Sequence, residues 1–211
     1  MIHEILPVGW LQCNCSILGD ETTREAIVVD PGDEIDEILA VLRRHRLTLK
    51  YIVITHAHID HIGGAKKLKD LTGAPVYMNE RDLELYGGLE QQARWVGVPT
   101  PPTTEIDVLL RDGDEIACGD IRASVMHTPG HTQGSICLLV PGTEPKLLAG
   151  DTLFRDSIGR TDLPGGDYQQ IMRSLKDKLL PLDDATVVVP GHGPITTIGR
   201  ERERNPFLQQ D

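Results

Sequence analysis

Residues 51–61 read Tyr51-Ile52-Val53-Ile54-Thr55-His56-Ala57-His58-Ile59-Asp60-His61. The first four are β-branched or aromatic and have the length of a strand buried in a sheet. Three of the eight histidines of the chain, together with one aspartate, fall between positions 56 and 61. Neutral imidazole binds zinc and iron well, and a carboxylate adds a hard anionic oxygen. The stretch therefore predicts a buried strand that ends in a metal-binding loop.

Three later segments have the same organisation. A predicted strand ending near Met126 is followed by a loop with His131, the apolar run 146–149 by Gly150-Asp151, and the run 186–189 by Pro190-Gly191-His192. A sheet gathers such loops at one edge, where a rigid scaffold can direct them to a common point. The sequence therefore predicts one site that collects seven candidate ligands: His56, His58, Asp60, His61, His131, Asp151 and His192.

Strand patterns alternate with helix patterns along the chain, which indicates an α/β fold. Ile35, Ile38, Leu39 and Leu42 recur at helical spacing, and the segments 63–72 and 79–95 predict further helices. Ile171, Leu175 and Leu179 mark another helix, with Asp167 as its N-cap. No Pro/Gly/Ser-rich linker divides the 211 residues. We therefore expect a single domain over residues 1–211.

The composition indicates which classes of binding partner are disfavoured. A formal net charge of −11 and the lack of a basic run disfavour nucleic acid and anionic membranes as partners. The first residues lack a signal-peptide pattern and no apolar run approaches about 20 residues, so we expect a cytoplasmic protein. The four cysteines are too scattered for a disulfide framework. Cys13 and Cys15, two apart on a strand, are interpreted as buried thiols that share one face.

The order His-x-His-x-Asp-His, then His131, Asp151 and Gly-His192, resembles the metallo-β-lactamase superfamily. More narrowly, it is similar to the glyoxalase II-like branch, the hydroxyacylglutathione hydrolases, in a compact bacterial form. The resemblance implies a four-layer αββα sandwich with the metal site at one edge of the two sheets. It extends over almost the whole chain through these further segments: Val29-Asp30-Pro31-Gly32, Thr128-Pro129-Gly130-His131-Thr132, Gly150-Asp151-Thr152-Leu153-Phe154 and Pro190-Gly191-His192-Gly193.

The resemblance implies two divalent metal ions. His56, His58 and His131 would hold the first ion, and Asp60, His61 and His192 would hold the second, with Asp151 bridging them. Zinc is the expected metal, and iron or manganese suits the same donors. A hydroxide bound to the metals would be the nucleophile, with Asp60 and Asp151 as the carboxylates of the catalytic centre.

The expected substrate is a small-molecule thioester, with S-lactoylglutathione as the first candidate. A thiolate leaves readily because the pKa of a thiol is about 8.5, so no further acid–base residue is required. The same nucleophile would attack an ester, which keeps lactones open. Arg155 and Arg160 could reach an anionic substrate, although an ion pair between Arg160 and Asp162 explains the latter arginine equally well. We expect a monomer or a small homo-oligomer.

A second reaction class stays open. Gly159-Arg160-Thr161-Asp162 also resembles the persulfide dioxygenases of the same fold, which use one iron held by the equivalents of His56, His131 and Asp151. The hydrolase is favoured because the complete second set of ligands is present. A non-catalytic relative would be marked by the loss of ligands, and none is missing.

For the remaining positions, the sequence allows either two interpretations or a structural one alone. Asp30 could orient a ligand histidine or only end a strand. His127 is interpreted as a packing or hydrogen-bonding residue. The charges from Arg200 to Arg204 predict a solvated helical face.

Overall fold

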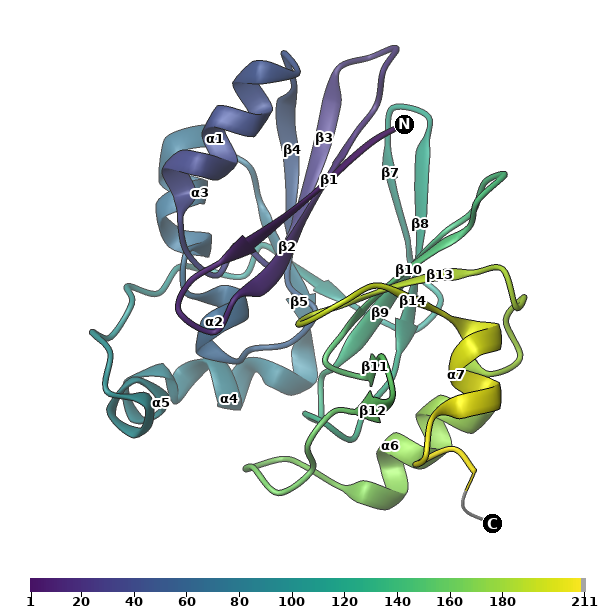
Figure 1. Cartoon of the computed structure of the whole chain (residues 1–211). Helices are drawn as coiled ribbons and strands as arrows, with labels where there is room; N and C mark the ends of the chain where they lie inside the picture. Colours follow the sequence, from purple (N-terminus) through teal and green to yellow (C-terminus); the bar gives the residue numbers. More distant parts are fainter. Residues whose placement is uncertain (210–211) are drawn as a thin grey trace.

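Two six-stranded sheets pack face to face in the computed structural model, which describes residues 1–209 (Figure 1). Strand order in the first sheet follows the sequence, β1-β2-β3-β4-β5-β6. β1 to β3 are antiparallel, and β3 to β6 are parallel. The strands are β1 Ile2–Val8, β2 Cys13–Gly19, β3 Glu25–Val29, β4 Thr48–Val53, β5 Val76–Asn79 and β6 Val108–Leu110.

The second sheet has the order β14-β13-β10-β9-β8-β7. Its neighbours are antiparallel except for the parallel pair β10 and β13. A separate two-stranded ribbon, β11 with β12, follows β10. The strands are β7 Glu115–Cys118, β8 Ile121–His127, β9 Ile136–Val140, β10 Lys146–Gly150, β11 Leu153–Phe154, β12 Ser157–Ile158, β13 Val187–Pro190 and β14 Thr196–Thr197.

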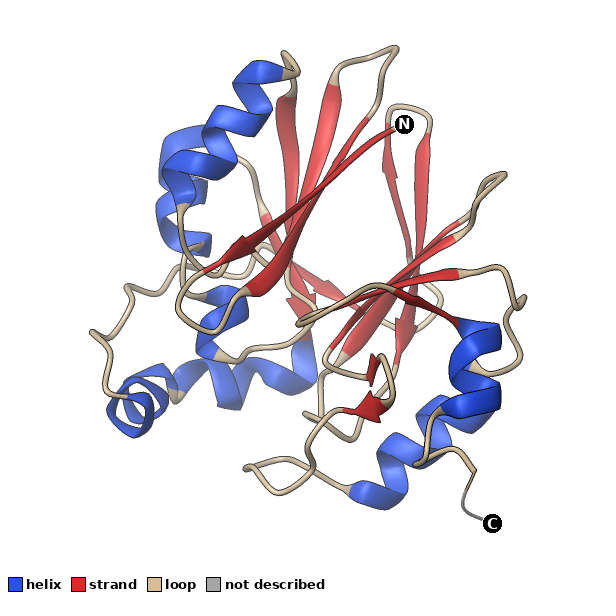
Figure 2. Ribbon diagram, viewed as in Figure 1, coloured by secondary structure: helices blue, strands red, loops and turns tan. Residues whose placement is uncertain are grey.

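Helices cover the outer face of each sheet (Figure 2). α1 and α3 lie against the first sheet, whereas α6, a π-helical turn (η2) and α7 lie against the second (Figure 1). The helices are α1 Ile35–Arg44, α2 Ile59–Ile62, α3 Ala65–Thr72, η1 Glu80–Asp82, α4 Leu83–Gly87, α5 Leu89–Val96, α6 Tyr168–Ser174, η2 Leu175–Leu179 and α7 Ile198–Arg204. None of the helices within residues 1–209 has the length and apolar character needed to cross a membrane.

The central strands β3 and β9 are apolar on both faces, because helices cover one face of each sheet and the other sheet covers the second face. In β3, Ala26 and Val28 pack with the helices of the first layer, whereas Ile27 and Val29 pack between the two sheets. In β9, Leu138 joins the core between the sheets, and Cys137 joins the core beneath α6. This alternation follows from the two-residue period of a strand. The α/β class and the four-layer αββα sandwich are thereby confirmed.

The helix predicted around Ile171, Leu175 and Leu179 begins as expected, with Asp167 accepting a hydrogen bond from Gln170 N. It then widens into a π-helical turn over Leu175–Leu179. Apolar residues spaced by four drift around a helix that has 3.6 residues per turn. A wider turn keeps all three side chains in the core, where each is fully buried.

The prediction of a solvated face from Arg200 to Arg204 is wrong for Glu201, which is fully buried in α7. Its carboxylate accepts hydrogen bonds from Thr196 Oγ1 at 2.5 Å, Asp156 N at 2.7 Å and Asn205 Nδ2 at 3.0 Å. These charge-assisted bonds replace the water that the carboxylate loses.

Candidate metal centre

The seven candidate ligands converge on one edge of the sandwich. His56 and His58 follow β4, Asp60 and His61 lie in the short helix α2, and His131 follows β8. Asp151 and His192 follow β10 and β13 in the second sheet. Helix α2 and the ribbon β11–β12 lie on the lower side of the molecule in the view of Figure 1. Donors from both sheets therefore meet where their loops adjoin.

One group of donors consists of His56, His58 and His131, whose ring nitrogens lie within 4.8 Å of one another. His58 Nδ1 and His131 Nε2 are only 3.0 Å apart. Three imidazoles that face one another in this way form the donor set typical of zinc and of iron.

A second group consists of Asp60, His61 and His192. His192 Nε2 lies 3.0 Å from Asp60 Oδ2 and 3.2 Å from His61 Nε2. The carboxylate of Asp151 reaches both groups, since Oδ2 lies 3.5 Å from His131 Nε2 and Oδ1 lies 3.4 Å from His61 Nε2. Asp151 is thus the side chain that connects the two groups.

Two buried polar atoms in this cluster lack a hydrogen-bond partner among the described residues, His56 Nε2 and Asp151 Oδ1. An unpaired buried acceptor costs about 1–3 kcal/mol. Metal ions held by the two groups would give both atoms a partner, so the donor set fits metal ions well.

The outward-facing nitrogens of three ligands are held by oxygen atoms. His61 Nδ1 lies 2.9 Å from Asp30 Oδ2, and His131 Nδ1 lies 2.8 Å from the Arg160 carbonyl. His192 Nδ1 lies 3.0 Å from the Leu11 carbonyl. Such contacts fix the tautomer, so that the nitrogen facing the cluster keeps its lone pair for a metal.

Of the two interpretations of Asp30, the contact with His61 supports the one in which Asp30 orients a ligand histidine. Its carboxylate also accepts from Thr55 N at 2.7 Å and from Thr55 Oγ1 at 2.6 Å, and Thr55 Oγ1 lies 3.1 Å from His56 Nδ1. The Cys13 thiol lies 3.5 Å from His61 Nδ1 and is fully buried, as is Cys15. Cys13 and His61 are 48 positions apart in the sequence, and no local sequence pattern predicts their contact.

The protonation states suit metal binding. Burial and the neighbouring imidazoles hold the pKa of His56 well below its ordinary value and lower the pKa of His58 to about 3. Burial also lowers the pKa of His61, but the acidic groups around it, Asp60 and Asp151 among them, outweigh burial and raise it well above its ordinary value. The carboxylates therefore require positive charge at this point, which a cation supplies as well as a proton does.

A cavity of about 610 Å³ opens over the cluster. Its walls are largely apolar, with Leu11, Trp95 and Leu163, and Arg160 is its cationic side chain. The Arg160 guanidinium also makes two 2.8 Å hydrogen bonds to Asp162, so this arginine is both paired and at the mouth of the site. Arg155 lines an adjoining cavity together with His131, Asp151 and His192.

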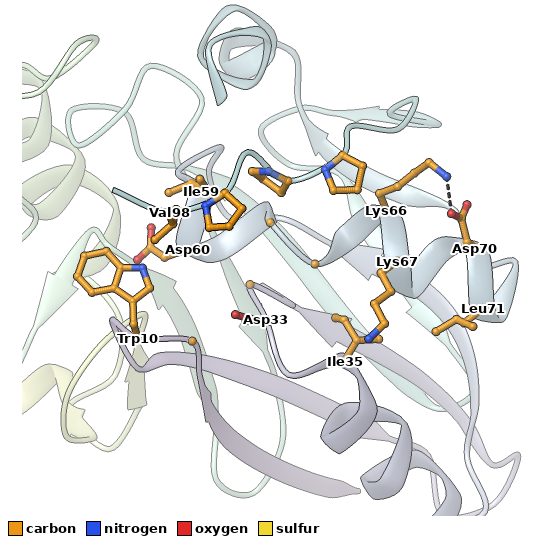
Figure 3. A pocket seen from close by; sticks show the side chains of 17 residues that line it. Trp10, Asp33, Ile35, Ile59, Asp60, Lys66, Lys67, Asp70, Leu71 and Val98 are labelled. Atoms are coloured by element: carbon orange, nitrogen blue, oxygen red, sulfur yellow. Dashed lines mark hydrogen bonds and ion pairs between the residues drawn. The ribbon is translucent and has the colours of Figure 1, made fainter. Parts of the chain in front are cut away.

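A further cavity, of about 780 Å³, is also lined by Asp60 (Figure 3). Trp10 and Val98 stand beside Asp60 at one end of it, and Lys66, paired with Asp70, stands at the other (Figure 3). Asp60 lines both cavities, so the two adjoin at the cluster.

His127 lies outside the donor groups. Its Nε2 is 2.9 Å from the Gln133 carbonyl, in agreement with the hydrogen-bonding interpretation.

Comparison with known proteins agrees with this geometry. The family model described as "Metallo-beta-lactamase superfamily" matches residues 8–192. Hydroxyacylglutathione hydrolase GloC of Haemophilus influenzae is 38% identical, over 97% of each chain. Among solved structures, the BLEG-1 B3 metallo-beta-lactamase superposes with a TM-score of 0.92 at 37% identity, covering 99% of this chain and all of that one. TTHA1623 in a di-iron-bound form gives a TM-score of 0.86 at 39% identity, covering 97% of this chain and all of that one.

The family match spans every candidate ligand from His56 to His192, and the relatives match almost end to end. The chain therefore belongs to the metallo-beta-lactamase superfamily and, within it, to the glyoxalase II-like branch.

Proposed function

We propose that the protein is a metal-dependent thioesterase that hydrolyses hydroxyacylglutathiones, with S-lactoylglutathione as its first candidate substrate. The observation that carries the proposal is the pair of donor groups joined by Asp151, with His56 Nε2 and Asp151 Oδ1 left free to bind cations. The similarity to GloC of Haemophilus influenzae supports the choice of substrate.

His56, His58 and His131 would hold one divalent ion, and Asp60, His61 and His192 the other, with Asp151 between them. Zinc is the first choice, and the di-iron form of TTHA1623 supports iron as the alternative. When bound at these residues, such ions would supply a hydroxide nucleophile at neutral pH and would polarise a substrate carbonyl.

The protein's own residues would orient the metal ligands and bind the substrate. Asp30 and the carbonyls of Leu11 and Arg160 fix the ligand imidazoles. The apolar wall around Trp95 offers a surface against which apolar parts of a substrate could pack. Arg160 offers a cationic contact for an anionic thiol carrier. The thiolate product leaves without a protein acid, since its pKa lies near 8.5.

The persulfide dioxygenase reaction is the second candidate. His131 and Asp151, two of its three iron ligands, lie 3.5 Å apart, and His56 faces His131 with ring centroids 4.8 Å apart. Against it, Asp60, His61 and His192 form a second, complete group of donors that one iron would leave unused.

The deciding experiment is hydrolysis of S-lactoylglutathione by purified protein, before chelation, after chelation and after restoration of Zn²⁺ or Fe²⁺. We expect turnover that the chelator abolishes and the metal restores. No turnover in protein that binds two ions would refute the thioesterase proposal. Oxygen consumption with glutathione persulfide would then favour the dioxygenase, and cleavage of a β-lactam would favour the activity named for BLEG-1.

A further inference from the structure

Asp82 is a buried carboxylate outside the donor groups. It is the last residue of η1, is only 1% exposed, and accepts three hydrogen bonds. Oδ2 accepts from Ala57 N and from Thr132 Oγ1, each at 2.9 Å, and Oδ1 accepts from Gly134 N at 2.6 Å. Each residue that donates one of these bonds lies close in the sequence to a candidate metal ligand.

The partners belong to two different loops. Ala57 lies between His56 and His58, in the loop that follows β4 of the first sheet, whereas Thr132 directly follows His131 in the loop after β8 of the second sheet. One carboxylate thus joins the two sheets at the point where His58 Nδ1 and His131 Nε2 stand 3.0 Å apart.

Gln92 of α5 reinforces the same loop. Its Oε1 accepts from Ile59 N at 2.9 Å, and its Nε2 donates to the carbonyls of Ala57 and Leu85, each at 3.1 Å. The backbone is therefore fixed on both sides of His58 by side chains from one helical region, 80–96.

We propose that Asp82 is a positioning residue for the metal held by His56, His58 and His131, and that it sets the separation of His58 and His131. The inference rests on the proposed metal site but not on the substrate. Charge-assisted hydrogen bonds to backbone N–H groups are strong and directional. Loss of such an outer partner typically lowers metal affinity about 10–100-fold.

The position requires a carboxylate rather than an amide. Ala57 N and Gly134 N donate to different oxygens of Asp82. Asparagine has one acceptor oxygen, so its NH₂ group must face one of the two buried N–H groups. Gly134 packs so closely against the carboxylate that a Cβ at this position would lie 2.6 Å from Asp82 Cγ.

The test is Asp82→Asn, with Zn²⁺ affinity and stoichiometry measured by competition with a chromophoric chelator. We expect one of the two ions to bind about 10–100-fold more weakly and the other to bind as in the wild type. In a His58→Ala background, which already lacks the first site, Asp82→Asn should leave the affinity of the remaining ion unchanged.

Asp20→Asn is the matched control. Asp20 is 3% exposed and also accepts three backbone hydrogen bonds, from Thr22, Thr23 and Asp120, at 2.6–2.7 Å. It follows the end of β2, whose other end, at Cys13, adjoins His61, so it lies at the opposite edge of the sheet. This control should lose a similar amount of stability while binding both ions normally.

Wild-type affinity for both ions in Asp82→Asn, or equal weakening of both, would overturn the proposal. If Asp82→Asn does not fold, Thr132→Val keeps a similar side-chain volume and removes one of the three bonds, together with the 2.7 Å contact between Thr132 Oγ1 and Ser135 Oγ. This variant should weaken the same single ion to a smaller extent; no weakening there would count against Asp82. Wild-type protein that binds no Zn²⁺ would overturn both this inference and the metal site. Zinc binding without thioester turnover would refute only the proposed substrate.

Discussion

Gly191→Ala should disable the site through a single methyl group. A Cβ at this position would lie 2.1 Å from Asp151 Oδ1 and 2.7 Å from His61 Cε1. The backbone cannot move away easily, because Gly191 N donates to the Gly150 carbonyl and its own carbonyl accepts from Asn14 N, both at 2.7 Å. Real Cβ contacts essentially never fall below 3.0 Å, so the carboxylate oxygen must move by about 0.9 Å.

A displacement of about 1 Å in a catalytic centre costs on the order of 100-fold in rate. We therefore expect kcat/KM for S-lactoylglutathione to fall about 100-fold in Gly191→Ala and Zn²⁺ affinity to fall with it. Gly193→Ala is the control: its backbone has φ of +74°, so alanine costs about 1 kcal/mol of strain, but nothing lies within 4 Å of the added methyl. Full activity with both ions bound in Gly191→Ala would refute the reasoning.

Three further results are expected. Asp151→Ala and His58→Ala should each remove most turnover and leave the far-UV circular dichroism unchanged; near-normal turnover would contradict the two-metal site. Burial, helped by Lys146, lowers the pKa of His3 to about 4 from 6.5, so folding favours its neutral form. Unfolding free energy should therefore fall as the pH drops from 6.5 to 4, by at most about 3 kcal/mol from this residue. Urea unfolding of His3→Gln should show a shallower pH slope, and an unchanged slope would exclude His3 as the cause. All four cysteines are buried, and burial raises the pKa of Cys13 and of Cys137 to about 11. Ellman's reagent should consequently label them only after unfolding, and rapid labelling of the native protein would show that the site region opens.

The convergence of the candidate ligands was predictable because two independent signals coincide at several of them. A residue type that binds metals stands directly after an apolar run with strand length, as at His56 and Asp151. Loops that follow strands of the same direction lie at one edge of a sheet, so such residues can meet there. The αββα layering required the family resemblance as well, because strand patterns do not specify which sheet a strand joins.

The supporting residues were not predictable in the same way. Asp82, Gln92 and Cys13 act through contacts with backbone or with a ring nitrogen that lie far away in the sequence. Asp82 and Gln92 belong to no spaced motif of ligands, and the Cys13-x-Cys15 spacing indicated burial but not the contact with His61. The burial of Glu201 was not predictable for the same reason. A charged residue among charged neighbours is predicted to be solvated unless its buried hydrogen-bond partners are known. Such tertiary hydrogen bonds have no local signature.

Overall charge and local recognition are determined by different residues. The net charge of −11 repels an anionic thioester at long range, but at physiological ionic strength screening confines that repulsion to about 8 Å. At the site, Arg155 and Arg160 line the cavities that contain the donors, and divalent ions would add further positive charge. An acidic chain can therefore accept a small anionic substrate.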